Sequence, residues 1–127
     1  MPQVYKLIST DSHIMEPHDL WKTGVDPKYQ ARAPIVVQED EVNYWFCDGK
    51  RLPRASGGKV VEDPRDKKFG RDWKEPRKGG WLPEEKIMDM DMDGVWGEVI
   101  YPTAGVYLFY VPDSGVFTAS ARRFNNW

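Results

Sequence analysis

The chain has 127 residues, a formal net charge of −2 and a hydrophobic fraction of 40% that includes six tryptophans. This length suits one domain, and the apolar content is sufficient for a packed core. The slightly acidic balance excludes the broad basic surface of a typical nucleic-acid-binding protein. No apolar run approaches the roughly 20 residues of a membrane-spanning helix, and the N-terminus lacks a signal-peptide pattern, so we expect a cytoplasmic protein without a membrane partner.

The first predicted element is a buried strand over residues 4–10, which ends in three potential metal ligands, Asp11, His13 and Glu16. Residues two apart in a strand point to the same side, so Asp11 and His13 can approach one ion together. A carboxylate oxygen and an imidazole nitrogen suit zinc, manganese or iron. Pro17 keeps Glu16 away from helical geometry, which leaves this turn open. The alternative is that these polar residues only cap a turn at the strand end.

A β-hairpin is predicted next, with strands at 35–38 and 42–47 and a turn at 39–41. Alternate residues of the second strand share one face: Val42, Tyr44 and Phe46. A further turn is indicated at 48–49 by an Asp-Gly pair. We expect Cys47, the sole cysteine, to be a buried and inert thiol, because nothing nearby in the sequence would lower its pKa.

Residues 54–80 are dense in charged residues, glycine and proline, and their mixed signs predict a solvated loop. Acidic residues interleave with the basic ones, which also argues against nucleic-acid binding. A loop of this length often forms a lid or an arm that binds a partner, and Phe69 and Trp73 are its expected anchors. We therefore retain, as one expected partner, a second copy of the chain that binds through the 54–80 loop to form a homo-oligomer.

Order returns with a helix predicted over 83–93, because Pro83 is followed by acidic residues and Gly94 is placed to cap the C-terminus. The apolar side of this helix is supplied by Ile87, Met88, Met90, Met92 and Val95. A second buried strand is predicted at 98–101 and is closed by Pro102.

Residues 103–112 receive no assignment, and a second helix is predicted over 113–127 with Asp113 or Ser114 as its cap. Its apolar side consists of Val116, Ala119, Phe124 and Trp127.

The predicted elements follow the order strand, helix, strand, helix, with an insertion at roughly 30–80 after the first strand. This βαβα order predicts an α/β fold with a parallel sheet. We expect one domain that spans residues 1–127. Two parallel strands alone cannot bury both faces. The sequence also ends within a helical pattern. We therefore expect the opening part of something larger, since a complete βα barrel takes about 250 residues.

The sequence DMDMDG at 89–94 copies the first half of a calcium-binding EF-hand loop. The twelfth position, which requires a bidentate glutamate, is Ile100. We therefore interpret the segment as an acidic helix face.

Several stretches together resemble the amidohydrolase superfamily in its aminocarboxymuconate-semialdehyde decarboxylase-like branch. The segments and their sequences are TDSHIMEPHDLW at 10–21, PEEKIMDMDMDGV at 83–95, EVIYP at 98–102 and RFNNW at 123–127. They resemble, in order, the N-terminal metal motif, the first barrel helix, the second strand and a helix in which Asn and Trp recur. Residues 54–80 carry no such match.

The resemblance implies the N-terminal part of a metal-dependent (β/α)8 TIM barrel, with its site at the carboxyl ends of the strands. Asp11 and His13 correspond to first-strand ligands of a divalent metal, with zinc expected first. Glu16 is either a third ligand or a residue that orients His13. Trp21 and Tyr101 are the candidate substrate-binding residues. His18 is not carried over, and we expect a partly exposed turn histidine there.

The implied activity is hydrolysis or non-oxidative decarboxylation of a small carboxylated or acyl substrate. The family supplies further His and Asp ligands from later strands, whereas this sequence has no histidine after His18. We therefore expect a fragment that is inactive alone, and no catalytic residue is assigned. The alternative is a non-catalytic fragment or interaction module that uses the aromatic hairpin and the 54–80 loop.

Overall fold

The computed structural model describes residues 5–40, 42–52, 65 and 77–127. The predicted loop anchors Phe69 and Trp73 lie outside the described residues, as does most of the 54–80 loop. No helix of the described part is long and apolar enough to cross a membrane.

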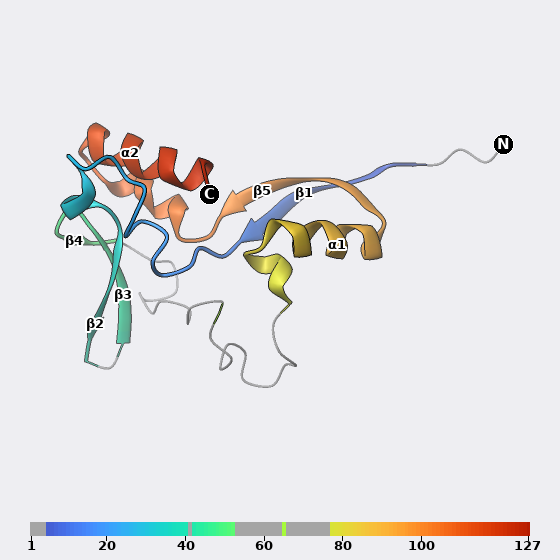
Figure 1. The fold of residues 1–127 in the computed structure, drawn as a ribbon, viewed down its shortest axis with the longest axis horizontal. Helices are drawn as coiled ribbons and strands as arrows, with labels where there is room; N and C mark the ends of the chain where they lie inside the picture. Colours follow the sequence, from blue (N-terminus) through green and yellow to red (C-terminus); the bar gives the residue numbers. More distant parts are fainter. Residues whose placement is uncertain (1–4, 41, 53–64, 66–76) are drawn as a thin grey trace.

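Two strands form a parallel pair that is separate from the rest of the molecule's sheet structure (Figure 1). Strand β1 (Leu7–Ile14) lies beside β5 (Val95–Pro102), and His13 pairs with Tyr101 near the carboxyl ends of both. Helix α1 (Pro83–Asp93) precedes β5 and packs along it, and Lys86 Nζ lies 3.0 Å from Glu98 Oε2 between the two elements. The predicted parallel strand–helix–strand arrangement is thereby confirmed.

Helix α1 has the ends that the sequence predicts. Pro83 is its first residue and acidic side chains occupy the first turn, where they face the positive end of the helix dipole. Gly94 has a φ of 69° and donates its N–H to the carbonyl oxygen of Asp91. A left-handed glycine of this kind ends a helix without a steric penalty. Asp89 remains in the helix and accepts a hydrogen bond of 2.6 Å from Arg77 Nε, as expected for an acidic helix face.

The second sheet is antiparallel and has the strand order β2 (Ile35–Glu39), β3 (Val42–Cys47), β4 (Lys50–Arg51). Asp48 and Gly49 between β3 and β4 both have positive φ, 54° and 70°, as a tight type I′ turn requires. The buried side of β3 carries Trp45 and Cys47, opposite the face of Tyr44. Burial raises the pKa of the Cys47 thiol to about 11, which agrees with the predicted inert cysteine.

The hydrophobic core lies beside this hairpin and away from the parallel strands (Figure 1). It is enclosed by the loop that follows β1, the short helix η1 (Gln30–Arg32), the hairpin, η3 (Gly105–Tyr110) and α2 (Ser114–Asn125). Its buried members are Leu20, Trp21, Val25, Ala33, Trp45, Cys47, Leu52, Ala104, Leu108, Val111 and Val116. The segment 103–112, which had no predicted structure, thus supplies η3 and part of the core.

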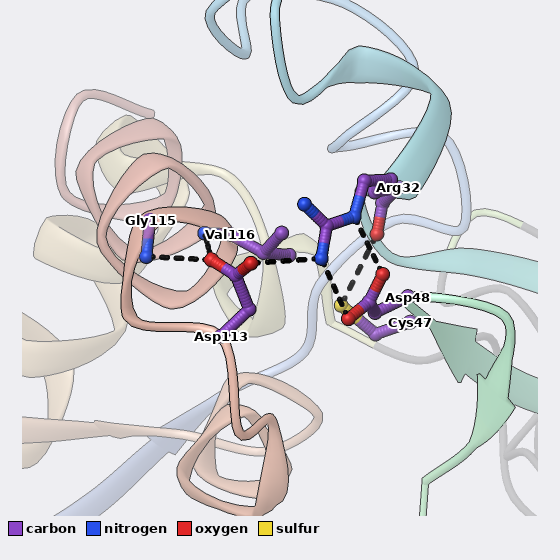
Figure 2. A network of polar contacts seen from close by, with 6 residues as sticks. All are labelled: Arg32, Cys47, Asp48, Asp113, Gly115 and Val116. Atoms are coloured by element: carbon purple, nitrogen blue, oxygen red, sulfur yellow. Dashed lines mark hydrogen bonds and ion pairs between the residues drawn. The ribbon is translucent and has the colours of Figure 1, made fainter.

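An arginine links the hairpin to α2, as Figure 2 shows. Arg32 donates to Asp48 at 2.6 and 2.9 Å and to Asp113 Oδ2 at 2.9 Å. Asp113 also accepts from the backbone N–H groups of Gly115 and Val116, which makes it the cap of α2. The Arg32 guanidinium lowers the pKa of both carboxyl groups, although for Asp113 the bond from the Val116 N–H is the larger cause.

The parallel pair and α1 leave a large apolar surface uncovered. Side chains exposed by 44–69% are Leu7, Ile8, Ile87, Met88, Met92, Trp96, Val99 and Ile100. The prediction that both strands and the apolar side of α1 would be buried is therefore wrong for this chain. Two strands and one helix cannot cover both faces of a parallel sheet, so burial here requires additional polypeptide.

Candidate metal site at the ends of the parallel strands

Asp11 and His13 project from the carboxyl half of β1 toward the same side. His13 Nε2 lies 3.7 Å from Asp11 Oδ1, and the two side chains are 56% and 84% exposed. Two ligands at about 2.1 Å from a tetrahedral metal are about 3.4 Å apart. The separation of these two donor atoms therefore fits shared coordination of one cation.

The local backbone of β1 is irregular where Asp11 lies. Between Ser9 and Ser12 the strand advances three residues while β5 advances two, from Glu98 to Ile100, so β1 carries one extra residue. The hydroxyl groups of Ser9 and Ser12 lie 2.8 Å apart across this bulge. A β-bulge turns side chains away from their regular direction and is frequent next to functional sites. Here it determines where Asp11 points relative to His13.

Tyr101 brings the second strand into the site. It pairs with His13 in the sheet register, and the two rings lie 6.1 Å apart, centroid to centroid, at an angle of 41°. Tyr101 is half exposed, so its ring is available beside the Asp11–His13 pair. The structure therefore brings three of the five predicted site residues together at the carboxyl ends of the two strands.

Glu16 is placed differently, because both of its oxygens are engaged by the backbone after β5. Oε1 accepts from the N–H groups of Thr103 and Gly105 at 3.1 and 2.8 Å, and Oε2 accepts from Ala104 at 2.8 Å. Burial raises the pKa of Glu16, and the three backbone bonds partly offset that effect. Within the described residues, no three His, Cys, Asp or Glu side chains gather closely enough to hold a metal.

Trp21 lies in the hydrophobic core and not beside Tyr101. Its side chain is 1% exposed, its indole Nε1 donates to the carbonyl oxygen of Ser120 at 2.9 Å, and its ring meets Trp45 edge-on at 5.3 Å. His18 lies in a turn and is partly exposed, as predicted, and its ring also packs edge-on against Trp45. These contacts give Trp21 a packing function in this structure.

The partners of Glu16 are the feature of the site that the sequence interpretation did not find. A Cβ at position 105 would lie 3.0 Å from Pro102 Cβ and 3.2 Å from Glu16 Oε1. Glycine therefore allows the backbone to approach the carboxylate closely. The available signal was the run of small residues directly after the proline that closes the second strand.

A hollow of about 330 Å³ lies elsewhere, between the loop after Trp21 and α2. Its lining includes Gly24, Tyr29 and Arg123 but none of the predicted site residues. The Asp11–His13–Tyr101 cluster is thus an open surface site and does not coincide with this hollow.

The fold of this chain is that of part of an amidohydrolase. The chain is similar to the crystal structure of an amidohydrolase from Mycobacterium avium subsp. paratuberculosis K-10, with a TM-score of 0.70 and 18% sequence identity. The similarity covers 99% of this chain and 38% of that protein, so this chain spans well under half of the length of the structure it matches. No family model and no curated protein matches the sequence. At this identity the likeness defines the fold and leaves the activity open.

Proposed function

We propose that the chain is the first part of a metal-dependent (β/α)8 barrel that hydrolyses, or decarboxylates without oxidation, a small carboxylated or acyl substrate. The observation that carries the proposal is the convergence of Asp11 and His13, 3.7 Å apart, at the carboxyl end of β1. The carboxyl ends of barrel strands are where such enzymes place their active sites.

Asp11 Oδ1 and His13 Nε2 would hold a divalent metal, zinc first and manganese or iron as alternatives. Such a metal lowers the pKa of a bound water to about 7 and polarises a substrate oxygen. Both residues would bind the metal through deprotonated donor atoms. Two side chains make a weak site, and the remaining ligands would come from polypeptide beyond these two strands.

Tyr101 is the proposed substrate contact of this chain. Its ring stands beside His13, and a phenol can both pack against an apolar group and donate a hydrogen bond to a carboxylate. Trp21 would affect the site only indirectly, because its ring packs in the core and so anchors the loop that follows β1.

The uncovered apolar surface supports the incomplete-barrel interpretation. Each strand of the β1–β5 pair has one edge without a strand partner among the described residues, and the helix packed on them exposes Met88 and Met92. Further βα units would pair these edges and cover these faces, as parallel sheets require. We therefore propose that the chain alone lacks catalytic activity.

Zinc binding by the purified chain tests the proposal. Equilibrium dialysis against zinc should show an equivalent that is lost in His13→Ala and in Asp11→Ala. His18→Gln is a matched control, because it removes the other histidine of the chain. Zinc uptake that is equal in His13→Ala and His18→Gln, or absent from the unmodified chain at millimolar zinc, would refute the proposed site.

The second candidate function is an interaction module without catalysis, and one observation favours it. Phe109 and Tyr110 of η3 are 75% and 67% exposed in addition to the uncovered faces of β1, β5 and α1. Exposed apolar surface of this extent is typical of a binding surface. Light scattering, which measures the molar mass in solution, separates the alternatives. A stable homo-oligomer that dissociates when Phe69 and Trp73 are substituted would favour the interaction module, with the 54–80 loop as its binding arm.

A further inference from the structure

Glu16 is a buried carboxylate whose hydrogen bonds span two strands that are distant in sequence. It lies two residues after β1 ends, whereas its three partners directly follow the end of β5. Each of these bonds therefore joins residues that are 87–89 positions apart in the chain. Glu16 is 4% exposed, and its bonds to the amides of Ala104 and Gly105 are buried, whereas the bond to Thr103 is partly buried.

Three consecutive backbone N–H groups, of Thr103, Ala104 and Gly105, point at the same carboxylate. Successive amides in this arrangement form a concave site that favours a negative charge. Gly105 is essential to the shape, since a Cβ there would meet both Glu16 and Pro102. The loop after β5 is thus fitted to a side chain at position 16 that accepts hydrogen bonds through both of its terminal atoms.

The same bonds connect the two halves of the candidate site. Ile14 pairs with Pro102 and His13 with Tyr101, so the last sheet pairs lie directly before the Glu16 clamp, by which we mean Glu16 with the amides of residues 103–105. Neither Asp11 nor His13 touches this clamp in any contact of the described residues. The clamp can therefore influence the site only by holding the ends of β1 and β5 in place.

We propose that Glu16 is a positioning residue that fixes the end of β5 against the end of β1, and thereby sets Tyr101 against the Asp11–His13 pair. This role deepens the proposed metal site, on which its functional part rests. It differs from metal ligation, because both carboxylate oxygens already accept backbone hydrogen bonds.

Glu16→Gln is the most informative variant, since it keeps the shape of the side chain and replaces one acceptor oxygen by an NH₂ group. That group would face at least one backbone N–H, so at least one of the three bonds must be lost. Glu39→Gln removes an exposed carboxylate from the end of β2 and serves as the control. Gly105→Ala disturbs the clamp from the opposite side and provides a second test if Glu16→Gln does not fold.

The measurements are amide hydrogen exchange at residues 103–105, the NMR shifts of the His13 ring, and zinc affinity by dialysis. We expect Glu16→Gln and Gly105→Ala to raise exchange at these amides at least tenfold, to move the His13 ring signals and to weaken zinc binding. Glu39→Gln should change none of the three. Unchanged exchange at 103–105 would overturn the clamp.

Faster exchange with unmoved His13 signals would overturn the positioning role and leave only a structural one. The exchange and ring-shift measurements do not depend on metal. If the unmodified chain bound no zinc, the proposed function would fail while these two measurements still decided the inference.

Discussion

Replacement of Trp21 by phenylalanine separates a core residue from a substrate-binding one. The indole N–H of Trp21 donates to the Ser120 carbonyl, and phenylalanine cannot make that bond. A lost hydrogen bond of this kind costs about 0.5–1.5 kcal/mol. The smaller phenyl ring also weakens the edge-on contact with Trp45, which is itself worth about 0.5–1.5 kcal/mol. The smaller ring also leaves a cavity, because the site is 1% exposed.

Together these losses should lower the free energy of unfolding by about 2–4 kcal/mol, which is large for a single substitution. For a chain of this size each kcal/mol shifts the melting temperature by about 3–5 °C. We therefore expect a decrease of about 6–20 °C in thermal unfolding followed by circular dichroism.

Trp96→Phe is the matched control, because Trp96 is 62% exposed and contacts Lys6 only through a cation–π interaction at 3.9 Å. Its melting temperature should change by about 3 °C or less, as is usual for an exposed position. Equal decreases in the two variants would refute the assignment of Trp21 to the core. A folded Trp21→Phe chain should also retain the zinc affinity of the unmodified protein.

Three further predictions concern the thiol, a helix end and the ion pairs around Arg32. Cys47 should resist iodoacetamide at neutral pH until the chain unfolds, as mass spectrometry can measure, because its pKa of about 11 keeps the thiol protonated. Gly94→Ala should lower the unfolding free energy by about 1 kcal/mol in urea titrations, because alanine is strained at a φ of 69°, and no loss would contradict the capping argument. The lowered pKa values of Asp48 and Asp113 contribute stability that is present above pH 3.8 and is lost as pH falls through their folded-state values. Arg32→Met should reduce the loss of unfolding free energy between neutral and acidic pH. An unchanged loss in this variant would show that the ion pairs are not its source.

Elements whose signals are local could be predicted from the sequence. The limits of α1 follow from Pro83 and Gly94, and Asp113 follows from the preference of aspartate for helix caps. The hairpin follows from two β-prone runs that are separated by turn residues. The approach of Asp11 to His13 agrees with the two-residue repeat of a strand, but Asp11 lies in the bulge between Ser9 and Ser12, so the repeat alone does not fix where its side chain points.

What could not be predicted depends on contacts between distant segments. Both faces of β3 carry large aromatic side chains, and Asn43 shares the face of Trp45 and Cys47, so alternation alone does not show that this face meets the core. Trp21 is near Asp11 and His13 in sequence, and its contacts with distant residues, the bond to Ser120 and the ring contact with Trp45, place it in the core. Likewise, no local pattern shows that the oxygens of Glu16 accept from amides after β5.

The two parts of the chain differ in how completely they are stabilised. The part formed by the hairpin, η3 and α2 has a buried core and the Arg32 ion pairs, whereas no residue of β1, β5 or α1 is buried. The candidate site lies at the junction of these parts, where the loops after β1 and β5 enter the core. The core thus holds one end of the parallel strands through Glu16, while their faces remain uncovered. This distribution agrees with the proposed site, at which Asp11 and His13 converge while no third His, Cys, Asp or Glu of the described residues gathers with them.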